Sequence, residues 1–209
     1  RDNMQKNLFT EQPLILDLPD ADVRYYPGFI DNSAVNYRAL VDEISWQQDT
    51  INMYGRSVLI PRMNAWYGDA NAHYGYSGLK LAPQPWTPGL LLLKTKIEKF
   101  LQTEFNSVLA NYYRDANDSV AWHADDEPEL GAQPVIASLS FGATRRFSLR
   151  RKSANGIAPF HIELASGSLL VMAGDTQKFW HHQVAKIKQP VAGRINLTYR
   201  FITENTHGK

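Results

Sequence analysis

The sequence predicts an α+β protein in which a mixed first half packs against a second half of short strands. Helix-like stretches lie before residue 105, whereas later runs rich in Val, Ile, Tyr, Phe and Thr alternate with Gly, Asn, Asp and Pro. Eight such runs with little helix between them are typical of a sandwich or barrel. Because no linker separates the halves, we expect residues 1–209 to form one domain.

Two helices are expected in the first half. The first covers residues 32–47, where polar residues at its start can cap it. The second begins at Thr87-Pro88, because Thr87 can cap the helix and Pro88 suits its first position. Apolar residues then recur at near-helical spacing up to about Phe105. The eight expected strands are residues 108–113, 120–123, 135–140, 146–150, 160–164, 168–172, 179–184 and 194–202.

The composition excludes several classes of protein and of site. The chain has 209 residues, 44% of them hydrophobic, and a net charge of +1, so no overall polycation signal points to nucleic acid. It contains no cysteine, which removes disulfides, thiolate metal sites and a cysteine nucleophile. No apolar run approaches the ~20 residues that span a bilayer. We expect a soluble monomer without membrane contact, in the cytoplasm or, in a eukaryote, the nucleus.

Five cations fall within eight positions, and this cluster has two interpretations. It can neutralise phosphates of a nucleic acid, or it can be the solvated face of a strand. Its members are Arg145, Arg146, Arg150, Arg151 and Lys152.

A candidate metal site starts from His123 and Asp125. Residues i and i+2 of a strand project from the same face, so the imidazole and the carboxylate would share one space. With a distant histidine they would make the three-ligand face of non-haem iron oxygenases, which leaves the opposite face of the metal open. His181 and His182 are adjacent and point to opposite strand faces, so only one of them can reach the metal easily. His161 is a third candidate, although a surface position is the simpler interpretation for it.

The last expected strand alternates polar and apolar residues. Its polar face carries Arg194, Asn196, Thr198 and Arg200, and its apolar face carries Ile195, Leu197, Tyr199 and Phe201. Two arginines on one strand face can bind a dicarboxylate, because each guanidinium holds a carboxylate through two hydrogen bonds. The alternative is a strand whose polar side faces water.

These motifs together resemble the AlkB family of iron(II)- and 2-oxoglutarate-dependent oxygenases. The segment 194–200 reads RINLTYR and is similar to that family's R-x-N-L-T-[FY]-R signature. The segments ASLSFGA at 137–143 and PR…AWYG at 61–68 resemble the branch with the human nuclear repair homologues. The resemblance runs from about residue 50 to 203, and the WHHQV segment at 180–184 favours His182 as the third ligand.

The resemblance implies a double-stranded β-helix, or jelly-roll, core at about residues 106–203. Residues 1–105 would then form a helical extension with a nucleotide-recognition lid. The metal ligands would be His123, Asp125 and His182, with Arg200 beside them. The residues that bind 2-oxoglutarate would be Asn111, Tyr113, Arg194, Asn196, Thr198 and Arg200.

The implied reaction is oxidative demethylation of N-alkylated bases such as 1-methyladenine and 3-methylcytosine. It consumes dioxygen and 2-oxoglutarate and releases formaldehyde, succinate and carbon dioxide. The partner would be alkylated DNA, with RNA as an alternative, and the base must leave the stack or lie in a single strand.

The residues expected to contact nucleic acid fall into three groups. A finger that fills the gap of a flipped base would use Tyr54, with Gly55 and a phosphate-binding Arg56. Stacking surfaces and acidic groups facing the lesion complete the set: Trp66, Tyr67, Tyr74, Tyr76, Ser77, Asp126 and Glu127. An aromatic cluster of this kind can equally belong to the core, and an acidic pair can be a solvated turn.

Three other functions share some of these residues. A 2-oxoglutarate oxygenase acting on a protein, a lipid or a small molecule would keep the metal site and differ in the lid. A non-catalytic nucleic-acid-binding module would not need the complete ligand set. A zinc hydrolase could use two histidines and a carboxylate but has no evident use for the paired arginines.

Overall fold

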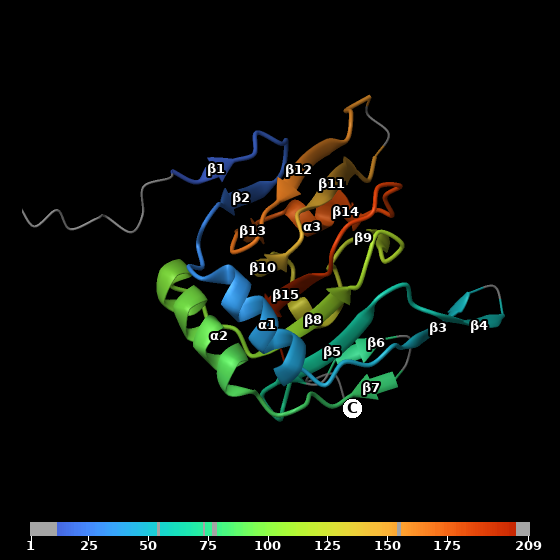
Figure 1. The fold of residues 1–209 in the computed structure, drawn as a ribbon. Coiled ribbons are helices and arrows are strands. Elements are labelled where there is room, and N and C mark those ends of the chain that lie inside the picture. Colours follow the sequence, from blue (N-terminus) through green and yellow to red (C-terminus); the bar gives the residue numbers. More distant parts are fainter. Residues whose placement is uncertain (1–11, 54, 73, 77–78, 154–155, 204–209) are drawn as a thin grey trace, which may run out of the picture.

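Two β-sheets make up most of the molecule, as the computed structural model shows (Figure 1). The structure describes residues 12–203 except 54, 73, 77–78 and 154–155. The larger sheet contains, in spatial order, β1 (Leu14–Ile15), β2 (Asp22–Tyr26), β13 (Leu169–Ala173), β10 (Ile136–Gly142), β15 (Arg194–Arg200), β8 (Ser107–Tyr113) and β5 (Met63–Gly68). The smaller sheet contains β12 (Phe160–Leu164), β11 (Arg145–Arg151), β14 (Trp180–Val184) and β9 (Val120–His123).

The remaining elements are two hairpins and short helices. One hairpin pairs β3 (Thr50–Met53) with β4 (Arg56–Leu59), and the other pairs β6 (Tyr74–Tyr76) with β7 (Leu79–Leu81). The helices are α1 (Ser33–Glu43), α2 (Pro88–Leu101), the one-turn α3 (Thr176–Phe179) and a 3₁₀ turn at Pro128–Leu130. In the described part of the chain, no helix has the length and apolar character needed to cross a bilayer.

The eight expected strands all form, whereas both expected helices end earlier than predicted. The first stops at Glu43 because Ile44 is extended and the chain then pairs with β5, where Gln47 N donates to Asn64 O at 3.0 Å. The second stops at Leu101 because Gln102 adopts a left-handed conformation with φ 53°. As predicted, Thr87 caps it, and its hydroxyl accepts from Leu90 N at 3.3 Å.

Strands from both halves of the chain share the larger sheet. β2 pairs with β13, and β5 pairs with β8, so the sheet crosses the division expected near residue 105. The sequence predicted the recognition segment in this first half but not that its strands extend the main sheet.

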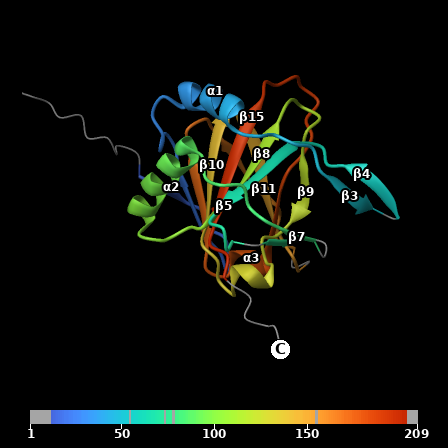
Figure 2. The same cartoon turned by 90° about the horizontal axis from the view of Figure 1, so that it is seen from below.

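Apolar side chains gather on both faces of the larger sheet. Helices α1 and α2 lie on its outer face (Figure 2), where Leu40, Leu90 and Ile97 pack against Leu197 and Tyr199 of β15. A second cluster lies between the sheets and includes Ile136, Leu149 and Trp180. Strand β15 is therefore buried along its whole length, and its polar side does not face water.

Candidate metal and cosubstrate site

A cavity of about 490 Å³ lies between the two sheets. The polar side of β15 forms one wall, through Arg194, Asn196, Thr198 and Arg200. The alternation read from the sequence is thus confirmed, and the alternative of a water-facing strand is wrong. Since buried polar groups require partners, a polar wall inside the protein indicates a polar ligand.

The three expected metal ligands lie close together in the wall of this cavity. His123, Asp125 and His182 each offer one ligand atom, and these atoms lie within 4.8 Å of one another. The two histidine rings have centroids 4.2 Å apart, and His182 Nε2 lies 3.9 Å from Asp125 Oδ2. Among the described residues this is the one group of His, Cys, Asp or Glu close enough to hold an ion. Two imidazoles and a carboxylate suit iron(II), which leaves further coordination positions for a cosubstrate.

Each of the two histidines has an imidazole nitrogen that can bind a metal, for a different reason in each case. His123 Nδ1 lies 2.8 Å from the Ala121 carbonyl, which can only accept, so the proton sits on Nδ1 and Nε2 is free to bind a metal. His182 is 4% exposed and stacks on Phe147 with ring centroids 5.3 Å apart. Burial, followed by the charge of His123, lowers the pKa of His182 to about 3, so its imidazole is neutral.

Asp125 reaches the site from beyond the end of β9, which stops at His123. The strand geometry assumed for the two ligands therefore holds only for His123. Two contacts place Asp125 instead: its backbone N donates to Gln177 Oε1 at 2.9 Å, and Arg200 Nη2 donates to its Oδ1 at 2.7 Å. Burial raises the pKa of Asp125, but the lowering effects, of which the charge of Arg200 is the largest, outweigh it and bring the pKa to about 2.

Arg194 is 1% exposed and lines the cavity. Its Nη2 donates to Ser140 Oγ at 2.9 Å, whereas Nε and Nη1 have no hydrogen-bond partner in the part of the chain that the structure describes. A buried guanidinium with two unused donors fits a carboxylate ligand. The residues present therefore fit both iron(II) and the distal carboxylate of 2-oxoglutarate.

Asn111 and Tyr113 of β8 line the same cavity, as expected. Arg62 Nε donates to Asn111 Oδ1 at 2.9 Å, so the amide NH₂ of Asn111 remains available to a ligand. Thr198 Oγ1 donates to Asn196 Oδ1 at 3.0 Å, while Asn196 Nδ2 donates to Ser138 Oγ at 2.7 Å. These bonds fix the polar groups of the wall in one orientation.

The other two candidate histidines lie outside the group of metal ligands. His181 points away from His182, as alternation along β14 requires, and is half-buried. His161 is exposed on β12, where its Nδ1 lies 2.8 Å from Ser148 Oγ. His182 is therefore the histidine that completes the group.

Only some of the residues expected to contact a base line the cavity. Glu127 lines it, but Asp126 does not: it is exposed and pairs with Lys152 at 2.7 Å. Trp66 and Tyr67 are buried, with 8% and 2% of their surface exposed, and neither lines the cavity. The Tyr67 hydroxyl accepts from Ser45 N at 2.9 Å, so this ring belongs to the core rather than to a stacking surface.

The remaining expected contacts lie in the two hairpins. Tyr54 and Ser77 are outside the described residues, and of Tyr74 and Tyr76 only the backbone, in β6, is described. Gly55 has a left-handed φ of 76° in the β3–β4 hairpin, and Arg56 is exposed. The hairpin projects from the body of the molecule (Figure 1), as a finger requires.

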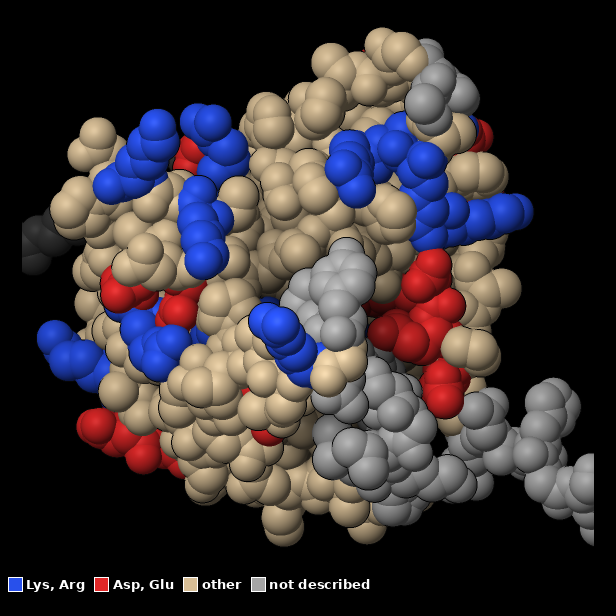
Figure 3. All heavy atoms as spheres, turned by 90° about the vertical axis from the view of Figure 1, so that its right-hand side faces the viewer, with Lys and Arg blue, Asp and Glu red and all other residues tan. Residues whose placement is uncertain are grey.

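The five clustered cations do not form one patch. Arg145 is buried, Arg146 pairs with Glu163, Arg151 with Asp20, and Lys152 with Asp126. Arg150 instead lies over the Trp122 ring, with its guanidinium carbon 4.4 Å from the ring centroid. Figure 3 shows one face of the molecule, on which Lys and Arg side chains gather in separate groups, and acidic side chains lie next to one of these groups. Neither simple interpretation of the cluster therefore holds for all five residues.

Three residues at the site were not anticipated from the sequence. Gln177 holds the Asp125 backbone, Arg62 orients Asn111, and Phe147 stacks on His182. Gln177 carries no spacing signal, because it lies 52 residues from its partner. The alternation along β11 could have placed Phe147 and Leu149 on the inner face together.

Comparison with known families agrees with this geometry. The 2OG-Fe(II) oxygenase superfamily matches residues 22–200. The chain is 42% identical over 193 residues to the alpha-ketoglutarate-dependent dioxygenase alkB homolog 3 of Mus musculus, covering 88% of this chain and 67% of the relative. It is 40% identical over 158 residues to the Homo sapiens DNA oxidative demethylase ALKBH2, covering 73% of this chain and 60% of the relative. The chain thus spans about two thirds or less of these relatives.

A solved structure described as OsALKBH1 shares the fold. It superposes with a TM-score of 0.63 over 91% of this chain and all of its own, at 18% identity.

Proposed function

Because the chain belongs to the 2OG-Fe(II) oxygenase superfamily and, within it, to the AlkB family, we propose that it demethylates N-alkylated bases of nucleic acid. The observation that carries this proposal is one cavity whose wall contains both a metal-ligand group and Arg194, with two unused donor atoms. When bound, iron(II) and 2-oxoglutarate supply the oxidation. One oxygen atom of dioxygen enters succinate as carbon dioxide leaves, and the other enters the N-methyl group, which is lost as formaldehyde.

The chain's own residues bind and orient the reactants. His123, Asp125 and His182 hold the iron, while Arg194 takes the distal carboxylate of 2-oxoglutarate. Asn111, Tyr113, Asn196 and Thr198 complete the cosubstrate wall, and Arg200 fixes the orientation of Asp125. Apolar side chains that line the cavity, among them Ile51, Ile60 and Leu109, exclude water around the reacting methyl group.

The cavity suits a cationic methylated base. Glu127 lines it, and a carboxylate there favours the positive charge that 1-methyladenine and 3-methylcytosine carry. A base enters such an enclosed site only if it is turned out of the helix or lies in a single strand. The projecting β3–β4 hairpin, with exposed Arg56, lies where it can contact the flanking strand.

Specific residues argue against two of the three alternative functions. A zinc hydrolase gives no role to the unused donors of Arg194, and a non-catalytic binding module does not need three converging ligands. An oxygenase for a protein or a small molecule shares the metal site, and only the substrate separates it from the proposal.

One assay tests the proposal directly. The iron(II)-loaded protein is incubated with 2-oxoglutarate and oligonucleotides that carry 1-methyladenine or 3-methylcytosine, single- or double-stranded, and loss of the methyl group is measured by mass. We expect demethylation with matching succinate formation. No demethylation, together with no stimulation of succinate formation by the oligonucleotide, would exclude the proposed substrate.

A further inference from the structure

A second buried arginine lies close to the cosubstrate wall. Arg145, at the start of β11, is 2% exposed, and no salt bridge joins it to a carboxylate among the described residues. Its guanidinium carbon lies 5.7 Å from the centre of the Tyr113 ring, and that of Arg194 lies 5.3 Å from the same ring. Arg145 belongs to the smaller sheet and Arg194 to the larger, so two cations from opposite sheets meet at one tyrosine.

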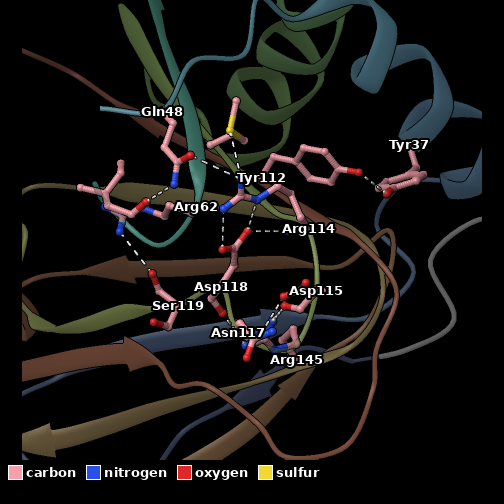
Figure 4. Close-up of polar contacts among 12 residues, drawn as sticks. Tyr37, Gln48, Arg62, Tyr112, Arg114, Asp115, Asn117, Asp118, Ser119 and Arg145 are labelled. Atoms are coloured by element: carbon pink, nitrogen blue, oxygen red, sulfur yellow. Dashed lines mark hydrogen bonds and ion pairs between the residues drawn. The ribbon is translucent and has the colours of Figure 1, made fainter. Parts of the chain in front are cut away.

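Backbone carbonyl groups hold Arg145 in place. Its Nη1 donates to Asp115 O at 3.0 Å, and its Nη2 donates to Asp118 O at 2.9 Å and Ala185 O at 2.7 Å. Figure 4 shows Arg145 directed at the loop between β8 and β9. These bonds fix the guanidinium, but neutral carbonyl groups do not cancel its charge.

The nearby carboxylates only partly compensate this charge. Asp118 accepts from Arg114 through both oxygens, at 2.7 and 2.9 Å, and so is already paired with another cation (Figure 4). Burial is the main cause that lowers the pKa of Arg194; Tyr113 opposes this effect and Arg145 adds to it. Two cations beside the same ring repel each other. An anion in the cavity relieves this repulsion.

We propose that Arg145 determines cosubstrate specificity: with Arg194 it makes the cavity select an oxo acid that has a second carboxylate. It acts as a positioning residue, since it holds the Tyr113 ring and contributes its charge through the protein without lining the cavity itself. This inference rests on the proposed function, because it assumes that the cavity binds 2-oxoglutarate. In a protein interior, removing a unit charge about 10 Å from a charged ligand changes the affinity for that ligand by about tenfold.

The experiment compares two oxo acids with the same number of carbon atoms. 2-Oxoglutarate has two carboxylates, whereas 2-oxovalerate has one. Their affinities for the iron(II)-loaded protein are measured without oxygen by titration calorimetry, for the unmodified protein, Arg145→Met and Arg145→Lys. Arg146→Met is the matched control, because Arg146 is the next residue, its side chain is 62% exposed, and it pairs with Glu163.

We expect Arg145→Met to weaken 2-oxoglutarate binding about tenfold and to leave 2-oxovalerate binding unchanged. Arg145→Lys keeps the charge and should keep most of the preference for the diacid, and Arg146→Met should change neither affinity. Equal weakening of both acids by Arg145→Met would assign Arg145 a purely structural role and overturn the inference, as would unchanged 2-oxoglutarate affinity. Should Arg145→Met not fold, loss of the diacid preference in a folded Arg145→Lys variant overturns it instead.

Failure of the proposed function has a different outcome. If the unmodified protein binds neither acid, the cosubstrate assignment is wrong, and this inference is overturned with it. If the unmodified protein binds 2-oxoglutarate and the Arg145 variants match it, only the role of Arg145 is wrong.

Discussion

Arg200 Nη2 lies 2.7 Å from Asp125 Oδ1, and both side chains are almost completely buried. The ion pair engages one oxygen of the carboxylate and turns the other, Oδ2, toward His182 Nε2 at 3.9 Å. Asp125 therefore presents a single oxygen to a metal. Arginine suits this position because it stays protonated even when buried, so it holds the carboxylate ionised with or without a metal.

The choice between the adjacent histidines can be tested by metal binding. We expect His182→Ala to abolish iron(II) binding, because it removes the ligand that completes the group. His181→Ala should largely retain it, since His181 lies on the other face of β14. Iron content after anaerobic loading and gel filtration measures both, and the reverse result would sink the assignment.

Gln177 should matter for the metal although it does not touch it. Gln177→Leu removes the acceptor of Asp125 N, so the loop that carries Asp125 loses one of its two fixed contacts. We expect iron(II) affinity to fall about tenfold, as for other residues that support metal ligands. Gln133→Leu is the control, because the Gln133 side chain lies at the surface, where its Nε2 donates to Asp175 Oδ1 at 3.0 Å. Equal affinities of the two variants would contradict this role.

The stability of the metal-free protein should depend on pH through His182. Its pKa is about 3 in the folded protein, against a usual value of 6.5 in the unfolded chain. Between these values the unfolded chain binds more protons, so the free energy of unfolding falls as the pH falls below 6.5, by up to about 1.4 kcal/mol per pH unit. Urea unfolding at pH 7.5 and 5.5 measures the slope. His182→Asn should reduce the slope, and the remainder comes from His181, whose pKa is also lowered by burial. His161→Asn should leave the slope as it is, and a slope unchanged by His182→Asn would show another group to be responsible.

The two acidic residues after the metal motif should differ in their effect on catalysis. Glu127→Gln removes a charge from the cavity wall, and we expect kcat/KM for 3-methylcytosine to fall about tenfold. Asp126→Asn removes an exposed charge that is paired with Lys152 and should change little. Assays on a methylated oligonucleotide compare them, and similar values for both variants would argue against a role of Glu127 in base recognition.

Tyr67 should affect stability rather than activity. Tyr67→Phe leaves the ring in the core but removes the acceptor of Ser45 N, which costs about 1 kcal/mol of the free energy of unfolding. We expect kcat/KM for the methylated base to stay the same. Urea unfolding and the demethylation assay give the two values, and lower activity with unchanged stability would restore Tyr67 to the nucleotide-recognition surface.

Local patterns predicted the second half of the fold and most of the wall of the site. Period-two alternation placed Arg194 and Arg200 on one face of β15. Adjacency showed only that one of His181 and His182 could reach the metal, and the family resemblance favoured His182. The same reasoning could not find Gln177 or Arg145, because their partners lie 52 and 27–40 residues away in the chain. It also misplaced Tyr67. An aromatic residue gives the same sequence pattern in a core as on a binding surface, and only the packing in the fold distinguishes the two.

The central position of β15 has a consequence for how the chain folds. This strand pairs with β10 on one side and β8 on the other, yet it is the last strand in the described part of the chain. If β10 and β8 form first, the larger sheet stays divided until residues 194–200 insert between them. Until then the open edges of β10 and β8 can pair with another chain. We expect slow refolding that is prone to aggregation, because so many contacts join residues far apart in sequence.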